Sequence, residues 1–282
     1  MTLLPGCRVA VAARFHLAAD WPARLTLGAG TDEADGRFFP RGPWRAPTAQ
    51  ELALLVAADA PGRSLPLLGE PDPPPADAPD TPDTLGLFQL PDHLREAWWD
   101  LLDAAAGDGG GVRGFDGFAA RVGEFLGFKR LGLPAAAGME AIVTAAGERS
   151  IRRDPDTGRP SGLGPTVAAW AAWPPNAGRS PPRLWGVVNL GDEPSGVVLV
   201  NLSLPDLAAA LASREPDAPP ATVGELVARF LRAFPDYPPV RVALGSGEGC
   251  RVPPGGLVLD GDPTGKRDPD MLLLISDPRV GD

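Results

Sequence analysis

Proline and glycine restrict this 282-residue chain more than any other feature, because it contains 35 of each. Proline lacks a backbone hydrogen-bond donor and fixes φ, while glycine destabilises the interior of helices and strands. A chain this rich in both is expected to consist of many short elements joined by turns. Its apolar fraction of 44% is still sufficient for a hydrophobic core, in one large domain or two small ones.

A proline- and acid-rich segment gives the clearest boundary in the chain. Residues 70–83 read EPDPPPADAPDTPD, a stretch with few backbone donors and no large apolar side chain. We therefore expect a linker over residues 70–85 and a main domain over residues 86–282. The α/β segment over residues 1–69 either stands alone or adds strands to the main sheet.

Capping signals and apolar periodicity predict the helices. Thr48-Ala-Gln-Glu51 and Thr222-Val-Gly-Glu225 are capping boxes, in which the threonine hydroxyl accepts from the amide three residues on and the glutamate reaches back. Asp92 and Ser203 are further candidate N-caps. The predicted helices cover residues 48–59, 92–106, 116–126, 205–213 and 222–233.

Short β-rich runs predict the strands. They are expected at residues 8–17, 140–144, 150–153, 185–190, 196–202, 240–244, 256–260 and 271–276. Residues 18–42 and 154–182 are expected to be loops, and the second loop is long enough to cover or line a site. Trp170 and Trp173 lie in that loop and are candidates for the wall of a binding pocket.

The charge and the cysteines limit the class of protein. A net charge of −10 with scattered arginines disfavours nucleic acid and anionic membranes as partners. No run of 18 apolar residues and no signal-peptide pattern occurs, so a soluble, cytoplasmic protein is expected. Cys7 and Cys250 are far apart and are expected to be free thiols rather than a disulfide or a zinc site.

The loop at residues 260–270 concentrates acidic side chains. Asp260, Asp262 and Thr264 follow the alternate spacing of calcium ligands, although Met271 stands where a bidentate glutamate would complete the loop. A solvated turn uses the same residue types, so both interpretations stay open. The spacing of Gly261, Gly265 and Lys266 does not match a phosphate-binding loop.

The order of elements over residues 140–276 resembles the double-stranded β-helix, the jelly-roll core of cupins and of Fe(II)- and 2-oxoglutarate-dependent oxygenases. Residues 185–200 (WGVVNLGDEPSGVVLV) are similar to the central strand pair of that family. Residues 249–258 (GCRVPPGGLV) are similar to its turn into the strand that delivers the last metal ligand. Lys266-Arg267 resembles the segment that brings a basic residue to the 2-oxoglutarate carboxylate. The resemblance implies an α+β fold, with a jelly-roll core and flanking helices.

The family's iron ligands are His-x-Asp or His-x-Glu plus a distal histidine, and this chain lacks that pattern. Neither His16 nor His93 is followed two residues later by an acid. Leu259 and Asp260 stand where the distal histidine is expected. The first hypothesis is therefore an oxygenase-like jelly-roll protein that has lost the standard iron site and binds a small molecule or a protein partner.

The alternative hypothesis is a divergent metal-dependent 2-oxoglutarate oxygenase, a hydroxylase with carboxylate-rich ligation. The resemblance would then imply Fe(II) and 2-oxoglutarate as cofactors, with Asp260 and Asp262 as metal ligands. Either histidine, His16 or His93, would complete the ligand set. In both hypotheses Arg267 or Arg251 is a candidate for pairing with a ligand carboxylate, because a guanidinium binds carboxylates in a bidentate manner.

Overall fold

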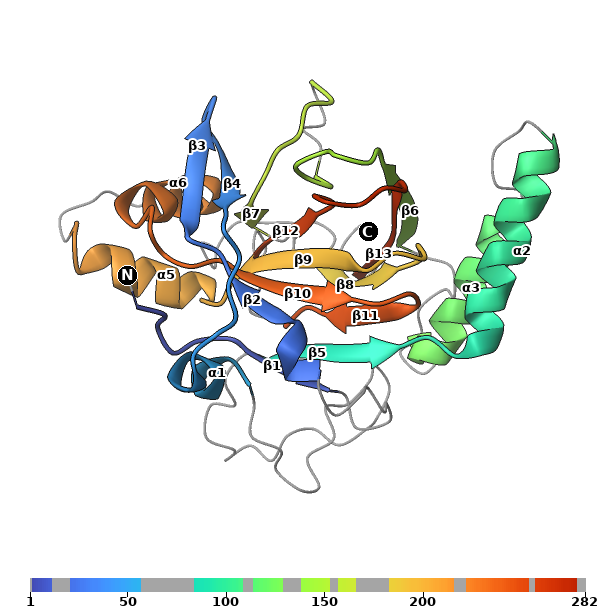
Figure 1. Ribbon diagram of the computed structural model, residues 1–282, viewed down its shortest axis with the longest axis horizontal. Helices are drawn as coiled ribbons and strands as arrows, with labels where there is room; N and C mark the ends of the chain where they lie inside the picture. The colour runs from blue at the N-terminus through green and yellow to red at the C-terminus, as the bar shows by residue number, and fades with distance from the viewer. Residues whose placement is uncertain are drawn as a thin grey trace.

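The computed structural model describes residues 2–11, 21–56, 84–108, 114–128, 138–152, 157–165, 183–215, 222–253 and 257–277. Within these ranges the chain is an α+β protein in which two β-sheets lie between helices at either end (Figure 1). No helix in the described ranges is both long and apolar enough to span a membrane.

Two large sheets and one hairpin make up the β-structure. The first sheet has the strand order β1 (Arg8–Val11), β5 (Thr84–Gln89), β11 (Glu248–Arg251), β8 (Arg183–Asn189), β13 (Asp270–Asp277) and β6 (Met139–Thr144). The second sheet has the order β2 (Leu25–Leu27), β10 (Val240–Leu244), β9 (Ser195–Val200), β12 (Val258–Asp262) and β7 (Gly164–Pro165). The hairpin joins β3 (Gly30–Ala34) to β4 (Arg37–Arg41). Within the two large sheets β1 and β5 pair in parallel, and the other pairs are antiparallel.

The strands between β6 and β13 pair in a nested order. β6 pairs with β13, β7 with β12, β8 with β11 and β9 with β10, so this part of the chain is one long antiparallel ribbon. Successive pairs alternate between the two sheets. Further pairing of β8 with β13 and of β9 with β12 joins the turns of the ribbon to one another.

One apolar core lies between the two sheets. Alternate residues of the first sheet, such as Leu87, Val187 and Leu272, join the second-sheet residues Val197 and Leu199 in a single buried cluster. The helices α5 (Leu204–Ala212) and α6 (Val223–Ala233) belong to the same cluster through residues that include Leu207 and Phe230. They lie at one end of the sheets in Figure 1.

A second apolar cluster covers the other face of the first sheet. Val188 and Leu273, which alternate with core residues, pack against Trp98 of α2 (Asp92–Asp108) and Phe118 of α3 (Phe115–Leu126). The Trp98 and Phe118 ring centroids are 5.4 Å apart. These two helices therefore close the first sheet off from solvent on the side opposite the core.

The predicted caps at Thr48, Thr222 and Ser203 are confirmed, whereas Asp92 is the first residue of α2 rather than its N-cap. Thr48 and Thr222 form complete capping boxes at α1 (Ala49–Leu55) and α6, because each hydroxyl accepts from the N3 amide and each N3 glutamate binds the threonine amide. Ser203 caps α5 by accepting from Asp206. The first helix is shorter than expected, because α1 ends at Leu55 and Val56 is extended and bridges to Val9; residues 57–59 lie outside the described residues.

Other local predictions also differ from the structure, and Thr84 and Leu85 of the expected linker at residues 70–85 belong to β5. The expected loop at residues 18–42 contains the β3–β4 hairpin, whose turn residues Asp35 and Gly36 both have positive φ, as a tight hairpin turn requires. The expected strand at residues 150–153 is irregular at residues 150–152. There the Ser150 hydroxyl accepts from the amides of Arg152 and Gly162, and such side-chain bonds compete with a strand ladder.

Candidate functional site

The two aspartates predicted as metal ligands lie on β12, in the second sheet. The strand register places Asp260 and Asp262 on the same face as Arg241 of β10, and Leu259 on the opposite face. Asp260 is 1% exposed and Asp262 is 4% exposed. Both carboxylates are therefore removed from bulk water and need partners within the protein.

Asp260 is held mainly by backbone amides. Its Oδ1 accepts from the amide of Gly261 at 2.8 Å and from the amide of Arg152 at 3.3 Å. Its Oδ2 has no hydrogen-bond partner among the described residues. Burial raises the pKa of Asp260 to about 6, while Ser150, Arg152 and the backbone amides oppose this rise.

Asp262 forms an ion pair with Arg241. Its Oδ2 lies 3.2 Å from Nε of Arg241, and its Oδ1 accepts from the amide of Thr264 at 3.0 Å. His93, the described histidine among the predicted ligands, is exposed in the first turn of α2, and His16 lies outside the described residues. Across the described ranges, no three His, Cys, Asp or Glu side chains are grouped so that they could hold a metal.

The basic residues expected near a ligand carboxylate contact acidic residues of the protein itself. Lys266 Nζ lies 2.5 Å from Asp270 Oδ1, and Ser195 donates to both oxygens of that carboxylate. Arg267 Nε lies 3.2 Å from Glu193, with 91% of the arginine side chain exposed. Two backbone amides and Arg267 lower the pKa of Glu193. These contacts fix the loop between β12 and β13.

The remaining predicted site residues are Arg251, Trp170 and Trp173. Arg251 is half-buried on β11, where burial lowers the pKa of its guanidinium. Trp170 and Trp173 lie outside the described residues. The structure therefore places Asp260, Asp262 and Arg267 along β12 and the loop that follows it, and His93 on a helix that covers the first sheet.

The end of the sheets at which β12 begins is filled. Val258 pairs with Val200, where β9 ends, and α5 and α6 follow β9 directly in the chain. Two polar side chains here make long-range contacts: the Tyr237 hydroxyl donates to Asn201 Oδ1 at 2.6 Å and accepts from the Leu4 amide at 3.3 Å, and Asn201 Nδ2 donates to the Leu4 carbonyl at 2.9 Å. The surrounding residues are buried and apolar: Leu202, Leu204, Leu207, Val252, Leu257 and Phe230.

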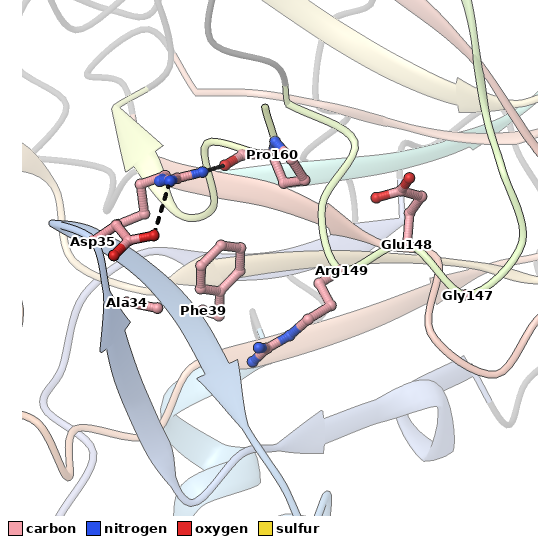
Figure 2. Close-up of a pocket in the computed structure, with 8 residues that line it drawn as sticks. Ala34, Asp35, Phe39, Gly147, Glu148, Arg149 and Pro160 are labelled. Carbon is pink, nitrogen blue, oxygen red and sulfur yellow. Dashed lines mark hydrogen bonds and ion pairs between the residues drawn. The ribbon is translucent and has the colours of Figure 1, made fainter. Parts of the chain in front are cut away.

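A surface groove lies between the β3–β4 hairpin and the segment that follows β6 (Figure 2). Its volume is about 270 Å³, and its lining residues are Ala34, Asp35, Arg37, Phe39, Gly147, Glu148, Arg149 and Pro160. The Arg149 guanidinium lies 4.7 Å from the centre of the Phe39 ring. Arg37 donates to the Pro160 carbonyl at 2.9 Å and contacts Asp35 at 3.3 Å. The groove thus combines an aromatic floor with two cations and two carboxylates.

The comparisons with known proteins do not assign either site to a family. No protein-family model, no curated protein and no solved structure matches this chain. Its function must therefore be inferred from its own residues.

Both walls of the groove depend on long-range contacts. On one side, β4 runs beside residues 160–163, and the Leu163 amide donates to the Phe38 carbonyl at 2.8 Å. On the other side, the segment after β6 is held at Arg152, whose amide donates to Asp260 Oδ1. The Arg152 carbonyl accepts from the Ser161 amide at 2.9 Å. Phe39 and Arg149 could not be paired from the sequence, because nothing local to either residue indicates that they meet. The Asp35-Gly36 dipeptide was the one available signal, since it marks a hairpin.

Proposed function

We propose that residues 139–277 form a double-stranded β-helix, and that the chain is a jelly-roll protein without the standard iron site that binds a protein partner. The nested pairing of β6 to β13 supports the fold assignment. A ribbon of antiparallel pairs that alternates between two sheets is the arrangement of a jelly-roll.

The filled end of the sheets is the observation that carries the proposed loss of iron. An oxygenase site needs convergent ligands and open positions for the co-substrate and oxygen. The resemblance puts the last ligand at Leu259 and Asp260 of β12, where Leu259 belongs to the apolar core that continues into α5 and α6 and Asp260 accepts from two backbone amides. Farther along the strand, Asp262 has Arg241 as its partner, which reduces its availability to a metal.

The groove supports a protein partner rather than an enclosed small molecule. Pockets for drug-sized ligands usually measure about 300–1,000 Å³ and bury most of the ligand. The present groove, at about 270 Å³, lies at the surface (Figure 2). Aromatic and arginine side chains such as Phe39 and Arg149 are common anchors of protein interfaces.

The charges around the groove favour a partner segment that has both acidic and basic side chains. Arg37 and Arg149 are balanced by Asp35 and Glu148, so a purely acidic or purely basic segment would meet repulsion from one pair. We infer that the groove binds an extended peptide segment with an acidic and a basic side chain flanking an apolar one. The apolar side chain would contact Phe39.

Labelled peptides test this assignment. Fluorescence anisotropy would compare three peptides of equal length: alternating acidic and basic residues around a leucine, all acidic, and all basic. We expect the alternating peptide to bind best and Arg149→Ala to weaken it about tenfold or more. Arg121→Ala, which removes an exposed arginine of α3 away from the groove, is the matched control. Equal effects of the two substitutions, or no preference among the peptides, would overturn the assignment.

One observation favours the divergent oxygenase as a second candidate. Asp260 Oδ2 is a buried carboxylate oxygen without a hydrogen-bond partner among the described residues, and a bound metal ion would satisfy it. In that case Asp260 would be a ligand and Fe(II) would supply redox chemistry with 2-oxoglutarate. The remaining ligands would have to come from outside the described residues, because within them no cluster exists.

Calorimetric titration with Mn(II), a redox-silent substitute for Fe(II), separates the two candidates. The experiment uses metal-free protein with and without 2-oxoglutarate. We expect no stoichiometric binding. Tight binding that 2-oxoglutarate strengthens and that Asp260→Ala abolishes would instead establish the oxygenase candidate.

A further inference from the structure

The strand β6 forms one edge of the six-stranded sheet. Among the described residues it pairs with β13 alone, through the register from Met139–Ile275 to Thr144–Asp270. An edge strand presents backbone donors and acceptors to any strand that approaches it. Figure 1 shows β6 at the end of the sheet, beyond β13.

Among the described residues, this edge lacks the usual protection against pairing with another chain. Proteins commonly protect edges with lysine, proline or a bulge. β6 has the sequence MEAIVT, with Glu140 as its single charged residue, and its register with β13 is regular. In addition, Val143 is 64% exposed, and it is the one large apolar side chain exposed to this degree in the described ranges.

The exposed valine continues an apolar strip. Met139 and Ala141 pack on the second apolar cluster, beneath α2 and α3, and Val143 lies on the same face of the strand. Glu140 and Ile142 lie on the other face. The apolar strip therefore runs along β6 from Met139 and Ala141, which the helices cover, to Val143, which is exposed.

We propose that a second copy of this chain docks on β6, so that the two β6 strands pair antiparallel and the sheet continues across both copies. Dimers with two-fold symmetry are the commonest oligomers, and their interface uses the same patch on each copy. The proposal does not depend on the groove or on the assigned function.

Symmetry restricts the register of this pairing. A two-fold axis perpendicular to the sheet keeps each face on its own side, so paired residues must come from the same face of β6. A register centred on Ala141 places Val143 opposite Met139 of the partner subunit. It also places Glu140 opposite Ile142 of the partner subunit, so that the two like charges do not face each other directly. In this register Val143 faces an apolar side chain and Glu140 does not face its own copy.

Analytical ultracentrifugation of the full chain tests the dimer. We expect the wild-type chain to form dimers as its concentration rises to about 100 µM, and Val143→Lys to be monomeric, because two lysines would be placed in the new interface. Since Val143 is exposed, the variant should keep the circular dichroism spectrum of the wild type. A monomeric wild type over the whole range, or a Val143→Lys variant that still forms dimers, would refute the proposal.

A complementary pair of variants tests the register. In the register centred on Ala141, a mixture of Val143→Lys and Met139→Glu chains would form a heterodimer in which the new lysine faces the new glutamate. We expect the mixture to recover dimers that neither variant forms alone. Recovery with Ala141→Glu but not with Met139→Glu would show that another register applies and that the centre on Ala141 is wrong.

Discussion

At the scale of single residues, Asp260 shows how burial and backbone contacts oppose one another. Two amides stabilise its ionised form, yet burial dominates and raises its pKa to about 6 from an ordinary value of 3.8. The Asp260 carboxyl therefore holds its proton more tightly in the folded chain than in the unfolded chain. The contribution of Asp260 to stability is greatest below about pH 4 and is lost as the pH rises to about 6.

The upward shift of the Asp260 pKa can be tested by substitution. The rise in pKa corresponds to about 3 kcal/mol in total, between pH values well below 4 and well above 6. Asp260→Asn cannot ionise, so we expect its free energy of unfolding to depend less on pH between about 4 and 6 than that of the wild type. Urea unfolding at several pH values measures this difference. Asp268→Asn, at an exposed position, is the control, and an unchanged pH dependence in Asp260→Asn would contradict the assignment of the shift to burial.

At the scale of elements, the helices could be predicted because their signals are local. Thr222 and Glu225 satisfy the first turn of α6 through atoms three residues apart, so the sequence contains the whole interaction. The strands β7 and β11 are short and were not predicted, because each exists only through partners far along the chain. The groove was missed for the same reason, since Arg149 meets Phe39 from another part of the sequence.

The local character of the α6 cap leads to a prediction about stability. Thr222→Ala removes the hydroxyl that accepts from the Glu225 amide, and we expect a loss of about 1 kcal/mol in the free energy of unfolding. Chemical denaturation measures this loss. Thr222→Ser keeps the hydroxyl and should retain most of the stability. An equal loss in both variants would mean that packing of the threonine methyl, rather than capping, is responsible.

At the scale of the whole molecule, Tyr237 connects three distant parts of the chain. Its hydroxyl joins Asn201 after β9 and the amide of Leu4 near the N-terminus, while its ring packs against Phe230 of α6 with centroids 5.5 Å apart. Such a connection could not be read from the sequence, because nothing local to Tyr237, Asn201 or Leu4 indicates that they meet. It explains why the N-terminal segment and the helical end share one core.

Removing the Tyr237 hydroxyl should therefore destabilise the whole fold rather than one element. Tyr237→Phe leaves the buried Asn201 Oδ1 without its donor, and we expect a loss of about 1–3 kcal/mol, seen as a lower Tm. Asn201→Ala and the double variant complete a double-mutant cycle. Strictly additive losses would show that the two side chains are not coupled.

The nested pairing of β6 to β13 also has a consequence for the order of folding. The pair β9–β10 joins residues nearest in sequence, whereas β6 and β13 come from the two ends of the ribbon, so closing the outer pair costs more chain entropy. We expect pulse-labelled hydrogen exchange during refolding to find protection in β9 and β10 before β6. Until the outer pair closes, β13 is itself a sheet edge, and aggregation during refolding would then begin from β13 rather than from β6.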